Sequence, residues 1–127
     1  MASARLSFFS EDAGQIIVRI WDISPKRLCR NHLLGEHREL HAIWVILTEG
    51  KRGYAHHPET LRWRGKLKAL YVRHKKLVEE MRRREYNHNS PLNARLATGA
   101  GFQYEHIDSY KEQLRIIKRK KCACRIT

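Results

Sequence analysis

The chain has few of the features that mark secreted, disulfide-bonded or membrane-spanning proteins. No apolar run reaches the roughly 18 residues that a membrane-spanning helix needs. Its three cysteines, Cys29, Cys122 and Cys124, are an odd number and cannot form a closed disulfide framework, which favours a reducing compartment. The N-terminal stretch MASARLSFFS has one basic residue and a weak apolar run, so we expect no export signal. The sequence therefore predicts a cytoplasmic protein that does not bind membranes.

Acidic residues are also scarce relative to basic ones. Lys and Arg number 26 against 13 Asp and Glu, which gives a formal net charge of +13. Such a charge attracts phosphate backbones and releases their counterions. The hydrophobic fraction of 42% is nonetheless enough for a folded core, and 127 residues suit one domain better than two. We expect a single monomeric domain, associated with the nucleoid, with nucleic acid as its leading partner.

The first half of the chain predicts an extended entry followed by a long helix. Residues 1–15 are small, polar and without pattern. The run IIVRIWDI that follows is either a short buried strand or an extended lead-in. Ser24 and Pro25 together make a strong helix start, because Ser can cap and Pro suits the first helical position. A helix is therefore expected over residues 25–48.

The second half predicts two further helices separated by connectors. A helix is expected over residues 61–85, with Gly65 breaking its first turn. The stretch ATGAGFQ, residues 97–103, is a connector and the segment we expect to be most mobile. Ser109 has a glutamate three residues later, which is capping-box spacing, and opens a last helix to about residue 121. The sequence thus predicts an all-α fold, a compact single-domain bundle of about three main helices behind an extended N-terminal lead-in.

The two long helices are expected to be amphipathic. In the first, Glu36 and Glu39 fall outside the apolar stripe, which consists of Leu33, Leu40, Ile43, Trp44 and Leu47. In the second, apolar residues and His74 share one side, and the opposite side carries Arg73, Lys75, Lys76 and Arg82 to Arg84. With the stretch RWRGKLK, which holds Arg62, Arg64 and Lys66, this basic side is either a phosphate-tracking surface or a merely solvated face.

Metal binding has two candidate sets of residues. His37 and His41 are four apart and share a helix face, so they could bind a metal with His32 or a carboxylate completing the site. The helix lacks the Glu that directly follows the first His in zinc proteases. The tail KRKKCACRIT has a C-x-C pair without a second pair at zinc spacing. Chance histidine pairs and incidental thiols explain both sets, so we expect no metal.

Two long stretches resemble the pyrimidine-dimer DNA glycosylase family. They are VRIWDISPKRLCRNHLLGEHRELHAIW and GKRGYAHHPETLRWRGKLKALYVRHKKLVEEMRRREYNHNSPL, and the likeness covers roughly residues 18–124. The elements RI, NHL and REL stand at the family spacing. The resemblance implies a compact helical DNA repair protein that is both a glycosylase and an abasic-site lyase and uses no metal or cofactor. Its implied partner is double-stranded DNA that contains a lesion or an abasic site.

The chemistry that the resemblance implies needs an amine and a carboxylate. A chain-terminal α-amine attacks C1′ of the damaged nucleotide, displaces the base and forms an imine, and β-elimination then cuts the strand on the 3′ side. An α-amine suits this task because its ordinary pKa is about 7.7–8.0, against about 10.4 for lysine. A carboxylate beside it stabilises the cationic sugar and moves protons.

Carried over by position, Glu39 takes the place of the catalytic carboxylate. Val18 aligns with the nucleophile. The remaining matched positions imply DNA contacts at Arg19, Asn31, His32 and Arg38, and Glu36 has a counterpart to which we assign no role.

The chain departs from the family pattern at three places. Val18 is preceded by seventeen residues, so its nitrogen is an amide that cannot form an imine. This is resolved if the valine codon is the true start, which would make residues 1–17 an extension and residues 18–127 the glycosylase-like domain. Ala42 stands where a phage member has a DNA-holding arginine. The tail from residue 102 differs from the aromatic, basic tail of that phage protein, so abasic-site cleavage is the firmer expectation.

Two other functions stay open at this point. A basic helical protein that binds DNA without chemistry is favoured by the blocked amine. A metal-dependent nuclease that uses His37 and His41 would lose its activity with a chelator.

Overall fold

The predicted all-α fold is confirmed by the computed structural model, which describes residues 19–50, 56–88, 90–120 and 122–125. Within these residues there is no strand, so the part of IIVRIWDI that is described is an extended lead-in. No helix there has the length and apolar character to cross a bilayer. The elements are η1 (Pro25–Arg27), α2 (Arg30–Glu49), α3 (Pro58–Leu61), α4 (Leu67–Arg83), η2 (Ala94–Leu96) and α5 (Tyr110–Arg119).

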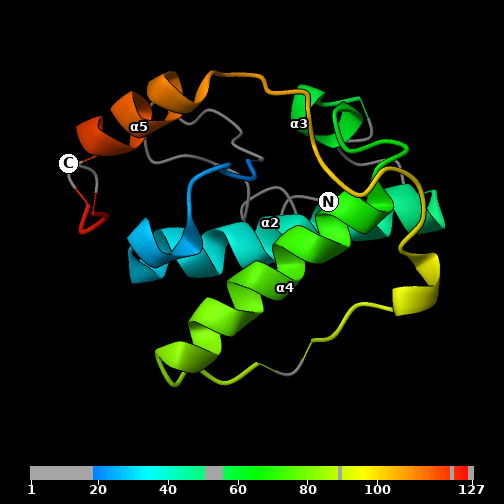
Figure 1. Cartoon of the computed structure of the whole chain (residues 1–127), viewed down its shortest axis with the longest axis horizontal. Helices are drawn as coiled ribbons and strands as arrows, with labels where there is room; N and C mark the ends of the chain where they lie inside the picture. Colours follow the sequence, from blue (N-terminus) through cyan, green and yellow to red (C-terminus); the bar gives the residue numbers. More distant parts are fainter. Residues whose placement is uncertain (1–18, 51–55, 89, 121, 126–127) are drawn as a thin grey trace, which may run out of the picture.

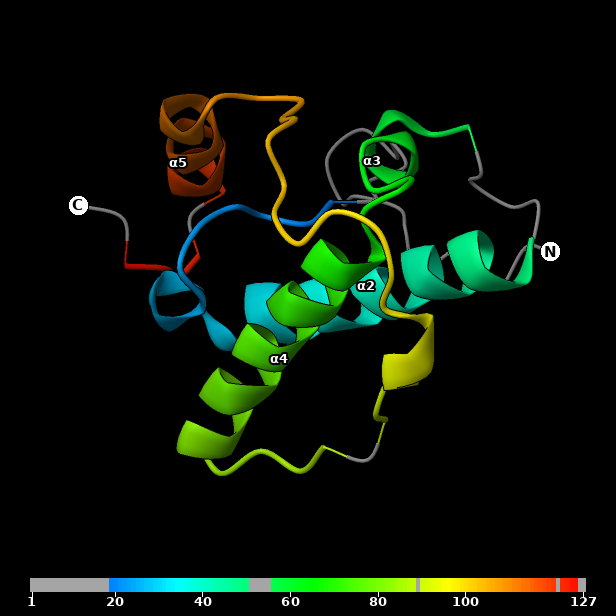
Figure 2. The same cartoon turned by 45° about the vertical axis from the view of Figure 1, so that its right-hand side comes forward.

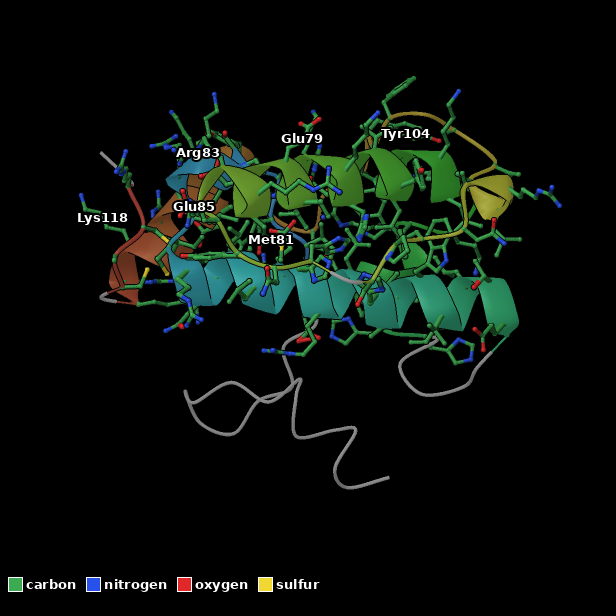
Figure 3. The ribbon with its side chains drawn as sticks, turned by 90° about the horizontal axis from the view of Figure 1, so that it is seen from below. Glu79, Met81, Arg83, Glu85, Tyr104 and Lys118 are labelled. Carbon is green, nitrogen blue, oxygen red and sulfur yellow. The ribbon has the colours of Figure 1, made fainter. Side chains whose placement is uncertain are left out.

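The core lies where α4 crosses α2 (Figure 1). The predicted apolar stripe of α2 supplies Leu33, Leu40 and Ile43, which are fully buried. Leu70 and Leu77 of α4 are equally buried opposite them. Figure 3 shows that Met81 points from α4 towards α2, whereas Glu79 and Arg83 point to the opposite side. The 3.6-residue periodicity of both sequences therefore predicts the side that packs.

The first long helix begins later than predicted. Pro25–Arg27 form a separate 3-10 turn, and Leu28 and Cys29 are extended before α2 starts at Arg30. The carbonyl of Leu28 accepts a hydrogen bond from Arg84 at 2.7 Å, and Arg84 also reaches the carbonyl of Pro25 at 3.2 Å. A guanidinium from the end of α4 thus binds carbonyls that a continuous helix would have used internally, which explains the break.

The second predicted helix is also interrupted, at Gly65, where the sequence predicts a break. α3 ends at Leu61, and Gly65 takes a left-handed φ of 77° before α4 begins at Leu67. This conformation is easy only for glycine. The backbone reversal separates two helices that the apolar pattern alone would join.

The stretch 97–103, predicted to be mobile, is held against the start of α4. Ala100 N–H donates to the Gly65 carbonyl at 3.0 Å. The carbonyls of Thr98 and Ala100 accept hydrogen bonds from Lys68 and Ala69 at 2.8 and 3.0 Å. These are N–H groups of the first turn of α4, which have no partner inside the helix. The connector therefore caps α4.

α5 closes the domain over the lead-in, which Figure 2 shows in blue running between α5 and α3. The predicted cap is confirmed, because the Ser109 hydroxyl accepts a hydrogen bond from the Glu112 N–H at 3.1 Å. Ile117 is fully buried in the core. The Gln113 side chain accepts from the Asp22 N–H and donates to the Asp22 carboxylate, both at 2.8 Å. α5 therefore fixes one end of the lead-in.

Replacement of Gly99 by alanine should destabilise the domain strongly. Gly99 has a φ of 84°, and an added Cβ would lie 2.2 Å from the Gly65 carbonyl oxygen. Backbone strain and this collision should lower the free energy of unfolding by about 3 kcal/mol. Gly101→Ala is the matched control, because its Cβ would meet only the flexible Lys68 side chain at 3.6 Å. Urea unfolding of the two variants measures the difference, and equal stability would contradict the close approach.

Candidate active site around Glu39

The backbone of Ile20 is held on both sides by a buried ion pair. Its N–H donates to Glu59 Oε2 at 3.1 Å, and its carbonyl accepts from Arg62 at 2.8 Å. Glu59 and Arg62 pair directly at 2.7 Å, with 2% and 6% of their side chains exposed. The Trp63 indole N–H donates to the same Glu59 oxygen at 3.1 Å. The lead-in is therefore fixed in position and register two residues after Val18.

Val18 itself, the predicted nucleophile position, lies outside the described residues, as do residues 1–17. Arg19 is the first described residue. Its guanidinium donates to Asp108 at 2.8 Å and lies 4.9 Å from the ring centroid of Trp21. The side chain next to the predicted nucleophile is thus tethered to the segment before α5.

Four glutamates are buried among the described residues, and one of them has no arginine partner. The three paired ones are Glu36 with Arg73, Glu59 with Arg62, and Glu80 with Arg83 and Arg84. Glu39 is 8% exposed and forms no ion pair within the described part of the chain. Its Oε2 is buried without a hydrogen-bond partner there. Burial of a carboxyl group without a partner costs free energy, so such a group calls for a functional explanation.

Burial raises the pKa of Glu39 to about 8, and the neighbouring positive charge of Arg38 opposes this shift only in part. A pKa near neutrality makes both the acid and the carboxylate accessible under ordinary conditions. A group that must give and later take a proton needs this property. The shift also marks Glu39 as a functional-site candidate, because strongly perturbed carboxyl groups concentrate at such sites.

The expectation that Glu36 and Glu39 lie outside the buried stripe of the first helix is wrong. Both are buried, and Glu36 pairs with Arg73 through two hydrogen bonds, at 2.6 and 3.1 Å. Arg73, expected on the solvated side of α4, instead points inward and also donates to the Ile23 carbonyl at 2.9 Å. Each of these two charged side chains can be buried because the opposite charge lies beside it. The two residues lie on different helices, so the pattern of one helix does not reveal the pair.

The residues other than Arg19 that were predicted to contact DNA fall into three groups. Asn31, Arg38 and Arg64 are exposed. Arg62 and Lys66 are buried. Arg62 donates a hydrogen bond to the Ile20 carbonyl. Lys66 donates to Glu105 at 2.6 Å and to the Arg62 carbonyl at 2.9 Å. The structure thus gives these two a structural role, away from the solvated surface.

His32 forms the third group by itself. Its Nδ1 lies 3.2 Å from Cys29 Sγ and 3.3 Å from Cys124 Sγ, and its ring contacts Trp21 edge-on, with 6.0 Å between centroids. The side chain predicted to line the DNA site is therefore engaged with two thiols.

Two groups of side chains could hold a metal ion. One comprises Cys29, His32, Cys122 and Cys124, and the other comprises His37, His41, His74 and His88. The pair His37 and His41 that the sequence singled out is thus joined by two histidines from α4 and the connector after it. Burial, with neighbouring imidazoles adding to it, lowers the pKa of His37 to about 4 and that of His74 to about 3. Glu39 belongs to neither group.

Sequence reasoning missed Glu59 and Asp108, which position the lead-in. Glu59 follows a proline in the stretch HHPET, and nothing local distinguishes it from an ordinary helix-start acid. Its partners Ile20 and Arg62 are 39 and 3 residues away. The i, i+3 pairing with Arg62 is the one signal that could have indicated it.

The site thus combines a buried carboxyl group that has no ion-pair partner among the described residues with basic side chains on a small helical domain. The sequence profile of the pyrimidine dimer DNA glycosylase family matches residues 18–94, which is more than half of the chain. The chain therefore belongs to the pyrimidine dimer DNA glycosylase family. The family consists of DNA repair proteins, so membership in it implies DNA as the substrate. No curated protein and no solved structure gave a match.

Glu39→Gln should stabilise the protein at pH 8 and change its stability little at pH 5. The folded-state pKa of Glu39 is raised from 4.5 to about 8. Between these values the folded state keeps a proton that the unfolded state has released, so the stability of the original protein falls as pH rises through this window. Glutamine resembles the protonated form and removes that loss, which is on the order of 3 kcal/mol at pH 8.

Urea unfolding of both proteins at pH 5, 6.5 and 8 measures this difference. Glu79→Gln is the matched control, because Glu79 is an exposed glutamate on α4. Its effect on stability should be nearly the same at each pH. A Glu39→Gln effect that is equally independent of pH would show that the Glu39 carboxyl group titrates as it does in water.

Proposed function

We propose that this protein is a DNA glycosylase with abasic-site lyase activity that acts on ultraviolet pyrimidine dimers or related lesions. The observation that carries the proposal is Glu39, the one buried glutamate in the described chain that no arginine neutralises. A carboxyl group that is buried without a partner lowers the stability of the protein. In the chemistry that this family implies, such a group faces a cationic intermediate, so its burial has a function. The membership in the family supplies the substrate class.

The nucleophile of the proposed reaction is an α-amine at position 18. Its lone pair attacks C1′ of the damaged nucleotide, and the bond from C1′ to the base breaks, so that the base leaves with the bonding pair and gains a proton. The nitrogen then loses one proton, and the C1′–O4′ bond opens as O4′ gains a proton, which leaves a protonated imine, the iminium cation. Removal of a proton from C2′ then expels the 3′ oxygen with its phosphate, and water releases the protein. No oxidant, reductant or metal is needed for this balance.

Glu39 serves two of the proton transfers in this sequence, the one to O4′ and the one from C2′. Protonated near neutral pH, it can donate to O4′ as the sugar ring opens. The iminium cation that forms beside it lowers the carboxyl pKa, because an opposite charge favours the ionised form. The resulting carboxylate stabilises the cation and can accept the proton from C2′. The proposed intermediate therefore itself switches Glu39 from acid to base.

Exposed polar groups on α2 supply the proposed DNA contact. Asn31 and Arg38 are seven residues apart, about two helical turns, so they share a side of the helix. Arg38 directly precedes Glu39, and its exposed guanidinium suits a phosphate beside the reacting sugar. C1′ chemistry on a duplex also requires the nucleotide to be turned out of the stack, which costs least at damaged or abasic sites. We expect the monomer to act in this way at the nucleoid.

The proposal requires a chain whose first residue is position 18. Residues 1–17 are then an extension, and residues 18–127 are the catalytic domain. The match to the family begins at residue 18, which supports this division. A valine codon that starts translation is read as methionine, and the bulky Arg19 after it should prevent removal of that methionine.

Borohydride trapping with a duplex that contains one abasic site tests the nucleophile. A chain that starts at position 18 with methionine should form a covalent adduct, and the 127-residue chain should form none. If both chains trap equally, the nitrogen comes from elsewhere, such as a lysine side chain. If neither traps while both bind the duplex, the protein is a DNA-binding module without this chemistry.

Glu39→Gln in the chain that starts at position 18 tests the proton role. Strand cutting should fall by about 10²–10⁴-fold, the usual contribution of a general acid or base, while binding of an uncut duplex changes little. Glu79→Gln should cut at the original rate. Equal loss of cutting and binding would instead make Glu39 a structural residue.

Mass spectrometry of the protein from its native host tests the start directly. We expect a chain that begins with methionine at position 18. A chain that begins at Ala2 would contradict the proposed amine.

A further inference from the structure

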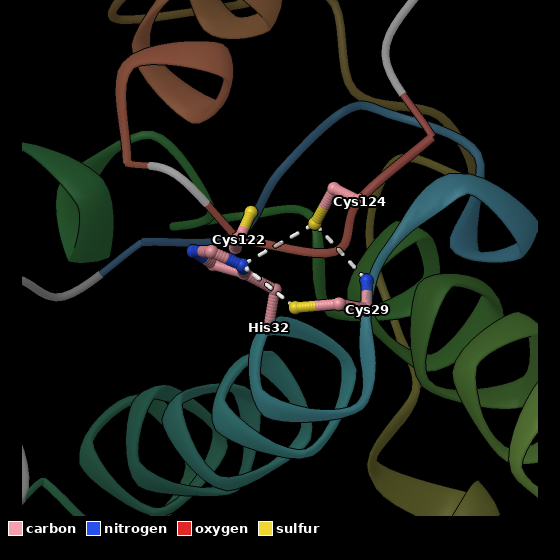
Figure 4. Close-up of side chains that lie close together, drawn as sticks. All are labelled: Cys29, His32, Cys122 and Cys124. Atoms are coloured by element: carbon pink, nitrogen blue, oxygen red, sulfur yellow. Dashed lines mark hydrogen bonds between the residues drawn. The ribbon is translucent and has the colours of Figure 1, made fainter.

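All three cysteines of the chain converge on one of its eight histidines. Cys29 is the N-cap of α2, and His32 lies in the first turn of that helix. Cys122 and Cys124 come from the tail after α5, and Figure 4 shows the Cys124 sulfur directed towards Cys29 and His32, with Cys122 beside them. The ligand atoms of the four residues all lie within 4.8 Å of one another. Residues more than 90 positions apart in the chain thus form one compact donor set.

The two distances from the His32 ring nitrogen to sulfur are close to those of a tetrahedral zinc site. With Zn–S bonds of about 2.3 Å and Zn–N bonds of about 2.0–2.1 Å, ligand atoms at the corners lie about 3.5–3.8 Å apart. In the structure, His32 Nδ1 is 3.2 Å from Cys29 Sγ and 3.3 Å from Cys124 Sγ. These contacts need to widen by only a few tenths of an ångström to admit the ion.

One of the three sulfurs already accepts a hydrogen bond from the backbone. The Cys29 N–H donates to Cys124 Sγ at 3.0 Å, the kind of hydrogen bond that stabilises sulfur with negative charge. Cys29 also stands at the positive end of the α2 dipole. Three thiolates, one neutral imidazole and Zn²⁺ carry a net charge of −1, which is favourable in a chain of formal charge +13.

We propose that Cys29, His32, Cys122 and Cys124 bind a structural Zn²⁺ ion that fastens the C-terminal tail to the start of α2. Four protein ligands fill the coordination sphere, so the site leaves no position for water or substrate. Two hydrogen bonds also hold the tail: the Arg125 N–H donates to the Arg27 carbonyl at 2.7 Å, and Arg27 Nε donates to the Arg125 carbonyl at 2.9 Å. The ion closes a loop of about 90 residues and therefore stabilises the folded state.

A second set of four side chains could also bind a metal ion. His37 and His41 of α2, His74 of α4 and His88 of the connector after α4 bring four ligand atoms within 4.8 Å of one another. His41 Nε2 and His74 Nε2 are 3.1 Å apart. The Nε2 atoms of His37 and His88 are buried without a hydrogen-bond partner in the described chain. Two buried imidazole nitrogens without a partner, beside two others that are 3.1 Å apart, are costly unless one ion binds all four.

This geometry points to a second Zn²⁺ site, made of four imidazoles, that joins α2, α4 and the connector after α4. Tetrahedral imidazole nitrogens lie about 3.3 Å apart around zinc, close to the distance between His41 and His74. Imidazole is a common ligand for this ion, whereas Mg²⁺ and Ca²⁺ prefer oxygen. Neither site includes Glu39, so both inferences are independent of the proposed repair reaction.

Zinc content and cobalt spectra of the full chain, purified under reducing conditions, test both sites. Elemental analysis should find two zinc ions per chain, one for each donor set. Substitution with Co²⁺ should add thiolate-to-cobalt charge-transfer absorption, which only the cysteine site can produce. Cys122→Ser with Cys124→Ser should remove this absorption and one zinc ion. His88→Gln should remove one zinc ion and leave the absorption unchanged.

His56→Gln is the control, because His56 is exposed and belongs to neither set. Folded protein without charge-transfer absorption would overturn the cysteine site, and an unchanged zinc content in His88→Gln would overturn the histidine site. Alkylation of the unmodified protein covers the case in which variants do not fold. With Zn²⁺ bound, the cysteines should react at least about tenfold more slowly than after treatment with a chelator. Equal rates would also refute the cysteine site.

Discussion

The buried pair of Glu59 and Arg62 is the interaction on which the geometry of the site depends, because it fixes where the chain enters the domain. Taking two charges out of water costs several kcal/mol per ion. Here that cost is offset by the direct contact and by hydrogen bonds to both backbone groups of Ile20. A pair of this kind adds little net stability, but it accepts the lead-in in one register only. That register sets where an amine at position 18 would begin.

The same physics makes Glu39 exceptional. Glu36, Glu59 and Glu80 show how this chain buries a carboxylate, namely with an arginine at 2.6–2.7 Å. A chain with 26 basic residues has no shortage of partners for a fourth. Glu39 has none among the described residues, so the burial that raises its pKa is not offset and costs stability at neutral pH. In the reaction that we propose, a cationic intermediate supplies that partner, and only during catalysis.

Local patterns predicted what depends on local physics. The packed sides of α2 and α4 follow from the spacing of residues such as Leu40 and Leu77, and the start of α5 follows from Ser109. The predictions failed where a partner lies far away in the sequence. Glu36 looked solvated because Arg73 is 37 residues distant, and the first helix looked continuous because Arg84 is 56 residues from the Leu28 carbonyl it binds. Cys29 likewise gave no sign of the two thiols near the other end of the chain.

These long-range contacts converge on α2, which makes that helix the reference element of the site. Glu36 joins its middle to α4, the four histidines join its inner side to α4 and the connector, and the proposed zinc–thiolate site would join its start to the tail. A helix fixed at several points along 20 residues has little freedom to tilt. Glu39 and Arg38 lie between these fixed points, so their positions relative to the lead-in are set by the fold before DNA binds. Such pre-organisation is what acid–base chemistry at a single sugar carbon requires.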